Sequence, residues 1–250
     1  MACLEHARAA AETALRLDAI DPMPHVALSW IAWIGDHDVV TCLRELTTAL
    51  KLAPEDAEVL RNMGQRHMCL GRFDDARKFL DKGLALDPLA MMLRTNRLML
   101  ARCMGRAQEA LQWGLAAVEI EPSSWFAQRE LGSAYCDMGD YANAVKCRAL
   151  GAELSGDAAA AAALREAFAA DGWRGFLRAS LREPKDAISR LELAVAHVQL
   201  DEFDHAFSVL DQIIDNHGQY ADRLKVDPSL APLHGDPRYA VLLKRAGFPE

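Results

Sequence analysis

The sequence has no clustered cysteines, no long apolar run and few aromatic residues, and these absences exclude several classes of protein. Its six cysteines stand singly, without the Cys-x-x-Cys pairs that mark zinc sites and disulfide frameworks. The longest apolar stretch, residues 26–34, is far shorter than the roughly 20 residues that a membrane span needs. We therefore expect no metal, no disulfide framework and no membrane segment.

The chain also has fewer basic than acidic residues. The 250 residues carry a formal net charge of −8, and no run of basic residues interrupts this balance. Nucleic acid backbones and anionic membranes attract clustered Lys and Arg, so neither is an expected partner. The first residues lack the charged and then hydrophobic regions of a secretory signal, which favours a cytoplasmic protein.

The residues that usually carry catalysis are present but are not grouped. No Gly-rich loop ends in Lys and then Ser or Thr, so a phosphate-binding loop is not expected. The eight histidines never stand at metal-ligand spacing within a helix. His67 and His197 are better interpreted as partly buried packing residues. We therefore predict no enzyme activity and no cofactor.

The residues that are present favour helices. Hydrophobic residues make up 51% of the chain and aromatics only 7%, with many alanines among them. Alanine has the highest intrinsic helix propensity and allows helices to pack closely. This composition predicts an all-α protein.

A repeat of 34 residues predicts how these helices are arranged. Pro54, Pro88 and Pro122 end similar phrases and stand 34 residues apart, while Pro22 precedes Pro54 by 32. Proline cannot continue a helix interior, so each one closes a unit before the next begins. A period of this length is typical of a repeat array.

Aligning the units on these prolines brings small residues into register, namely Gly71, Gly105 and Gly139, then Ala76, Ala110 and Ala144 five positions later. A glycine tolerates the left-handed conformation of a tight turn between two helices. An alanine lets the second helix cross closely over the first. Each unit is therefore predicted to be a helix–turn–helix hairpin.

This pattern resembles the tetratricopeptide repeat family. The resemblance implies a right-handed superhelical solenoid of antiparallel helix pairs that binds protein or peptide partners in a concave groove. The predicted organisation is a half-repeat or cap helix (1–22), a four-unit array with a shortened first unit (23–156), an atypical helical hairpin (157–184), a diverged repeat (185–217) and a C-terminal capping segment (218–250).

The hairpin at 157–184 is predicted to break at Asp171-Gly172. Asp236 should cap a last short helix whose first turn contains Pro237, and Tyr239, Leu242 and Leu243 should seal the open end of the stack. Phrases within residues 165–249 also resemble the repeat region of bacterial multidomain regulators. That resemblance leaves an alternative function open: a regulatory or sensory segment of a transcription regulator or nucleotide cyclase.

The concave groove is the predicted binding site. Residues spaced three, four and seven apart on the first helix of each unit should line it: Arg61, Gln65 and Met68, then Thr95, Met99 and Arg102, then Phe126, Arg129 and Ser133. Asn62 and Asn96 should flank this face and bond to the backbone of a bound peptide. The basic character of the groove against an acidic chain predicts an acidic or mixed apolar–acidic protein segment as partner. The alternative is that Arg61 and Arg129 pair with Glu58 and Glu130. Self-association into a homo-oligomer also stays open.

Overall fold

The computed structural model describes residues 2–182, 187–216 and 221–248, and these residues form helices and turns without a strand. The α-helices of the first half are α1 (Ala2–Leu17), α2 (Met23–Trp30), α3 (Val39–Leu52), α4 (Ala57–Cys69), α5 (Phe73–Leu86), α6 (Met91–Cys103) and α7 (Ala107–Ile120). Those of the second half are α8 (Trp125–Asp137), α9 (Tyr141–Leu154), α10 (Ala158–Ser180), α11 (Ala187–Gln199), α12 (Phe203–Asp215) and α13 (Pro237–Arg245). Shorter helical segments are the π-helix η1 (Ile31–Gly35) and the 3-10 helices η2 (Ala221–Arg223) and η3 (Pro228–Leu233). The predicted all-α class is confirmed.

The contacts divide the chain into two compact units. Unit 1 comprises Met1–Pro88, Leu210–Val226 and His234–Glu250, and unit 2 comprises Leu89–Val209 and Asp227–Leu233. The chain passes from unit 2 to unit 1 within α12. The predicted boundaries at Pro184 and His217 lie outside the described residues.

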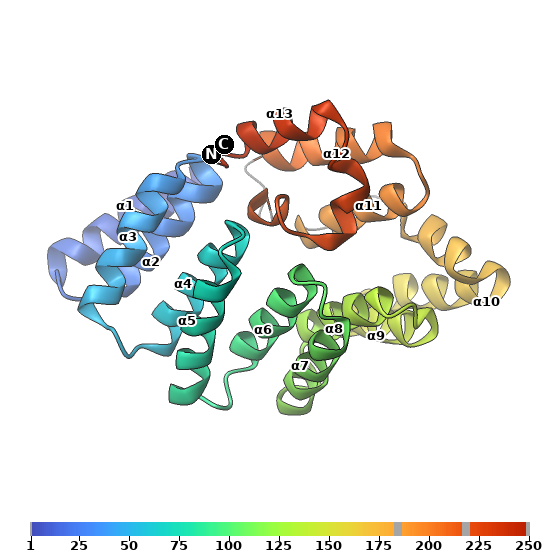
Figure 1. The fold of residues 1–250 in the computed structure, drawn as a ribbon, viewed down its shortest axis with the longest axis horizontal. Helices are drawn as coiled ribbons and strands as arrows, with labels where there is room; N and C mark the ends of the chain where they lie inside the picture. Colours follow the sequence, from blue (N-terminus) through green and yellow to red (C-terminus); the bar gives the residue numbers. More distant parts are fainter. Residues whose placement is uncertain (1, 183–186, 217–220, 249–250) are drawn as a thin grey trace. The chain divides into compact units, whose positions relative to one another are not determined.

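Antiparallel helix pairs build both units (Figure 1). In unit 1 α2 packs on α3 and α4 on α5, and in unit 2 α6 packs on α7 and α8 on α9. The glycines at the turns have positive φ angles of 78° at Gly71, 69° at Gly105 and 74° at Gly139, as the sequence predicts. Asp201 takes the same conformation with φ of 60° in the turn that lacks glycine.

Small residues hold the paired helices close together. Ala76, Ala110 and Ala144 are fully buried where the second helix of each pair crosses the first. Gly114 of α7 is equally constrained, because a Cβ there would lie 2.7 Å from Leu98 Cδ1 of α6. Side chains longer than these would push the helices apart.

An arginine occupies a usually apolar place in the unit that begins at α6. Arg97 is buried, with its guanidinium 5.0 Å above the centre of the Trp113 ring and 3.3 Å from Glu109 Oε1. The ring face and the carboxylate together compensate the buried charge.

The long helix α10 is two helices joined at a kink. Asp171 and Gly172 have non-helical backbone angles, with φ of 57° at Gly172. These are the two residues at which the sequence predicts a break. Beyond the kink, Phe176 and Leu177 pack into a hydrophobic cluster with Val145 of α9 and Ala196 of α11. The kink thus lets α10 cover both of its neighbours.

The C-terminal segment divides between the units, and its residues 221–226 and 234–248 pack within unit 1. Asp236 caps α13 by accepting a hydrogen bond from the backbone N–H of Arg238, and Tyr239 donates to the Leu224 carbonyl. The Phe248 ring meets Trp33 edge-on, with 5.7 Å between ring centres. The short helix and its Asp236 cap thus lie where the sequence predicts them, and Phe248 adds a contact with the first repeat that the sequence does not predict.

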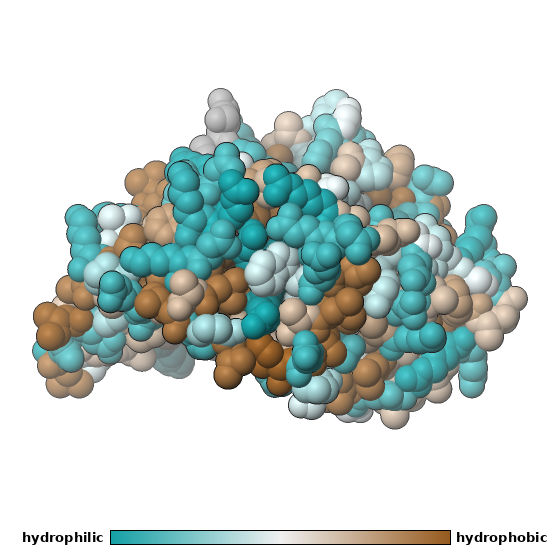
Figure 2. Space-filling model, turned by 60° about the horizontal axis from the view of Figure 1, so that its bottom comes forward, coloured by the Kyte–Doolittle hydropathy of each residue, from teal (hydrophilic) through white to brown (hydrophobic). Residues whose placement is uncertain are grey.

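The surface is mixed in polarity. Figure 2 shows hydrophilic side chains interspersed with hydrophobic ones over the face that it displays. The most exposed apolar side chains are Leu17, Ile20, Val40 and Leu89. Among the described helices, none combines the length and the apolar character that crossing a membrane requires.

Candidate functional site

The predicted groove residues of unit 1 lie together on α4. Arg61 donates to the Glu58 carboxylate, with 2.7 Å between Arg61 Nε and Oε2, and also to Gln65 Oε1. Asn62 is fully buried and accepts a hydrogen bond of 2.7 Å from Trp30 Nε1. The alternative pairing that the sequence offers for Arg61 is therefore present, and Asn62 joins α4 to α2.

Beside them, the chain's own C-terminal segment approaches α4. Arg66 Nη1 lies 2.8 Å from Asp222 Oδ2 of η2, and both side chains are almost completely buried, at 1% and 2% exposed. The Arg66 guanidinium also lies over the rings of Trp30 and Trp33, at 4.2 and 4.9 Å from their centres. Arg66 is therefore part of the interior of unit 1, where these contacts hold it.

In unit 2 the groove residues of α6 are buried as well. Asn96 and Met99 are buried, and Arg102 donates to the Asp137 carboxylate at 2.6 Å and to Ser229 Oγ of η3 at 3.2 Å. Burial acts to lower the pKa of Arg102, but the carboxylates of Asp227 and Asp137 outweigh it and raise that pKa. This arginine stays charged and holds the C-terminal segment of unit 2.

The last two predicted groove residues lie on α8. Phe126 is half-buried and packs edge-on against Trp125, with 5.9 Å between ring centres. Arg129 donates to the carboxylate of Glu192 on α11, at 3.2 Å from its Nε to Oε1. The sequence alternative names Glu130 as the Arg129 partner, whereas the structure shows an ion pair with Glu192.

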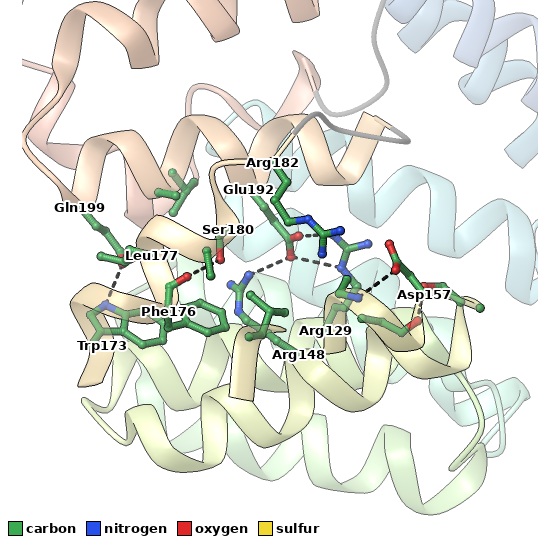
Figure 3. A pocket seen from close by; sticks show the side chains of 18 residues that line it. Arg129, Arg148, Asp157, Trp173, Phe176, Leu177, Ser180, Arg182, Glu192 and Gln199 are labelled. Atoms are coloured by element: carbon green, nitrogen blue, oxygen red, sulfur yellow. Dashed lines mark hydrogen bonds and ion pairs between the residues drawn. The ribbon is translucent and has the colours of Figure 1, made fainter. Parts of the chain in front are cut away.

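A cavity of about 280 Å³ opens beside Arg129 in unit 2 (Figure 3). Its walls come from α8, α9, both halves of α10, and α11, and it is lined by Arg129, Arg148, Ala152, Ser155, Gly156, Asp157, Ala160, Leu164, Trp173, Phe176, Leu177, Ala179, Ser180, Arg182, Glu192, Val195, Ala196 and Gln199. The kink at Asp171 and Gly172 separates the two halves of α10 that both contribute to the lining.

Two arginines converge on one carboxylate at the polar side of the cavity. Arg129 and Arg148 both donate to Glu192, with 2.9 Å between Arg148 Nη1 and Oε1 (Figure 3). Arg148 also donates to Ser133 Oγ at 3.1 Å. Burial acts to lower the pKa of Arg148, and the Glu192 carboxylate opposes it, so that the pKa is raised overall.

Two glycines make room for these arginine side chains between α8 and α9. A Cβ at Gly132 would lie 2.9 Å from Arg148 Cγ, and a Cβ at Gly151 would lie 2.8 Å from Arg129 Cγ. The arrangement is reciprocal, since each arginine crosses the glycine of the neighbouring helix. The small residues of the repeat thus place both guanidiniums beside the cavity.

The opposite wall is aromatic and apolar. Trp173 stacks between Tyr141, at 4.5 Å between ring centres, and Phe176, at 4.6 Å. Its indole N–H donates to Gln199 Oε1 at 3.1 Å. The stack holds the Trp173 ring in place at the cavity, and the hydrogen bond holds Gln199 beside that ring.

The cavity carries a charge opposite to that of the chain. Its lining holds three arginines, including the exposed Arg182, and two carboxylates, those of Asp157 and Glu192, which leaves one net positive charge. The chain as a whole has a net charge of −8. Paired guanidiniums beside an apolar wall suit a ligand that combines a carboxylate with an apolar group.

Sequence reasoning found Arg129 but missed most of the cavity. Arg148, Trp173, Glu192 and Gln199 come from three further helices, and no repeat spacing links them. One usable signal was the break at Asp171-Gly172, which marks where a repeat departs from its pattern.

Comparison with known proteins bears on the fold. Residues 57–90, which contain α4 and α5, match the tetratricopeptide repeat family. The TPR repeat-containing thioredoxin TTL4 of Arabidopsis thaliana is 28% identical over 123 residues, which are 48% of this chain and 18% of that protein. The chain therefore spans less than a fifth of the length of this relative.

Two solved structures are similar over most of the chain. The APC/C hetero-tetramer Cut9-Hcn1 has a TM-score of 0.56 at 19% identity, covering 97% of this chain and 39% of that one. A tetratricopeptide repeat protein from Parabacteroides merdae has a TM-score of 0.50 at 16% identity, covering 90% and 98%. At these identities the likeness shows the fold alone, and it confirms the predicted class: an all-α solenoid of tetratricopeptide-type helix pairs.

Proposed function

We propose that this chain is a non-catalytic scaffold that binds a short segment of a partner protein in the cavity of unit 2. The observation that carries the proposal is the pair of guanidiniums, Arg129 and Arg148, placed opposite the Trp173–Phe176 wall. A tetratricopeptide-type array is a scaffold fold that generally serves protein interaction, which supports the same function.

The chemistry of the cavity defines the segment. An Asp or Glu side chain, or a terminal carboxylate, would bond to the guanidinium side, where charge-assisted hydrogen bonds are strong. A neighbouring aromatic or aliphatic side chain would occupy the apolar side. A volume of about 280 Å³ admits one such side chain with its acidic neighbour, and not a folded domain.

The proposal centres on Arg129 among the predicted groove residues. Arg61, Asn62 and Arg102 have partners within their own units, and Asn96 and Met99 are buried. Arg129 and Arg148 also have a partner, Glu192, but they line an open cavity in which a second acidic group can reach them. We therefore place the recognition of the acidic group at α8 and α9.

Selection of peptides tests this proposal. The full chain would be presented with a phage-displayed library of random dodecapeptides, and the enriched peptides should carry Asp or Glu next to an aromatic or aliphatic residue. The affinity of an enriched peptide would be measured by fluorescence polarisation. Loss of a charge-assisted bond is worth about 1.5–3 kcal/mol, so Arg129→Ala or Arg148→Ala should weaken binding about tenfold or more.

Arg165→Ala is the matched control, because Arg165 pairs with Glu153 on the surface of unit 2 and does not line the cavity. This variant should bind the peptide as the unmodified chain does. Enriched peptides without acidic residues, or equal affinity in all three variants with their helix content intact, would contradict the proposal.

A second candidate function is a regulatory segment of a larger bacterial regulator or cyclase. The phrases that resemble such proteins include residues of the C-terminal segment. In unit 1 that segment covers Trp33, and its Arg245 pairs with Asp211 and Asp215 of α12. A segment that covers a repeat surface can control access to it. An in-frame winged-helix or cyclase sequence upstream of Met1 would support this candidate, and an unrelated upstream sequence would count against it.

A further inference from the structure

Three side chains with metal-binding atoms meet at the turn between α11 and α12. His197, Glu202 and His205 offer two imidazole nitrogens and a carboxylate oxygen that all lie within 4.8 Å of one another. His197 Nδ1 is 2.7 Å from Glu202 Oε2, and the two imidazole rings stack with 5.3 Å between their centres. Among the described residues, this is the only group of three such side chains.

The backbone of the turn holds the three residues in place. The N–H of Glu202 donates to the His197 carbonyl at 2.9 Å, and Asp201 takes the left-handed conformation that reverses the chain. This geometry brings His205, which is eight positions after His197, to the start of α12. There it lies beside the end of α11. His197 and His205 therefore face each other through the fold of the repeat, not through chance side-chain positions.

The other repeats show what is particular to this turn. In the repeat of α4 and α5 the corresponding residues are His67 and Asp75, with 3.9 Å between Nδ1 and Oδ2. Arg72 stands where Glu202 stands, so that turn carries a cation in place of the third donor. The fold of the repeat thus brings these positions close together in both hairpins. Only residues 197–205 place three metal-binding side chains there.

We propose that His197, Glu202 and His205 bind a divalent transition-metal ion of the Zn²⁺ type. Two imidazoles and one carboxylate are a set that Zn²⁺ accepts, with water as the fourth ligand. Ligands about 2.0–2.2 Å from the metal in tetrahedral geometry lie roughly 3.4 Å apart. The Glu202 and His205 side chains are both exposed, so they are free to rotate from separations within 4.8 Å toward that distance when an ion binds.

The bound ion would tie the end of α11 to the start of α12. His197 is largely buried, with 13% of its side chain exposed, and Glu202 is more open, with 42% exposed. One donor is therefore fixed by packing, while the others close over the ion from the solvent side. This inference stands apart from the proposed peptide binding, because none of the three residues lines the cavity.

Titration with Zn²⁺ alone tests the inference. The full chain, without an affinity tag and with its thiols kept reduced, would be titrated by calorimetry, and Co²⁺ would report coordination through its visible absorption. We expect one ion per chain, and an affinity reduced about tenfold or more in His205→Ala and in Glu202→Gln. Zn²⁺ should also raise the melting temperature of the unmodified chain but not of His205→Ala.

His25→Ala is the matched control. His25 Nδ1 lies 2.8 Å from Glu45 Oε2, which is a similar His–Glu pair without a third donor, so this variant should bind Zn²⁺ as before. Absence of Zn²⁺ binding by the unmodified chain at micromolar to millimolar concentrations would overturn the inference. Binding that His205→Ala and Glu202→Gln leave unchanged would also overturn it, since it would place the ion elsewhere, for example on cysteine thiols.

Discussion

Arg66 shows how a charged side chain is kept inside unit 1. Its charge meets the Asp222 carboxylate and two indole faces, those of Trp30 and Trp33, so that ionic and cation–π contacts offset the loss of water. Arg66 comes from α4 and Asp222 from a turn 156 positions later in the chain. A single residue pair thus joins a repeat to the C-terminal segment.

Breaking this pair should therefore be costly. Asp222→Ala leaves the Arg66 charge buried without its counter-ion, which costs about 3–5 kcal/mol of the free energy of unfolding. Urea unfolding followed by circular dichroism measures this loss. Replacing both partners, Arg66→Met with Asp222→Leu, should recover much of it, because no charge is then left buried. A loss below about 1 kcal/mol in Asp222→Ala would mean that the pair is solvated and structurally minor.

At the scale of the element, the helix–turn–helix unit was predictable from the sequence because its determinants are local. Gly71 and its counterparts at the turns, and Ala76 and its counterparts at the crossings, recur at one period and have the same physical role each time. Arg97 fits the pattern less well, since its burial depends on Trp113 and Glu109 of the neighbouring helix. A position is therefore predictable where the same residue type has the same role in each repeat, and less so where one repeat uses its own set of partners.

The crossing of α6 and α7 gives a prediction at this scale. Ala110 is fully buried there, so Ala110→Trp should overpack the crossing and lower the free energy of unfolding by about 1–3 kcal/mol or more. Gln112→Trp is the control, because Gln112 is exposed on the same helix. Thermal unfolding should give a lower midpoint for the first variant only. Equal midpoints would mean that the crossing has room for a large side chain.

At the scale of the whole molecule, the parts that the sequence did not predict are those made by distant segments. The cavity needs Arg129, Arg148, Trp173 and Glu192 from four helices, and repeat spacing says nothing about how a kinked helix meets its neighbours. The contact of Phe248 with Trp33 is equally remote in sequence. Such pairings depend on tertiary packing, and no local pattern in a single sequence predicts them.

The C-terminal segment connects these observations, because it contributes to both units. Residues 227–233 belong to unit 2, where Ser229 contacts Arg102, and residues 234–248 belong to unit 1, where Phe248 covers Trp33. Trp33 has no exposed surface while this segment is in place. A chain without it would leave apolar surface open in unit 1 and a buried arginine short of a partner in unit 2.

Ending the chain at Lys225 should therefore destabilise both units and promote self-association, since a repeat array needs covered ends. Light scattering after size exclusion would show the association, and hydrogen exchange would show lost protection in α2 and α4 of unit 1 and in α6 of unit 2. Phe248→Ala is the graded comparison: it removes the contact with Trp33 and keeps Ser229, so only the helices of unit 1 should lose protection. A shortened chain that stays monomeric with unchanged exchange in both units would show that residues 226–250 are dispensable for the fold.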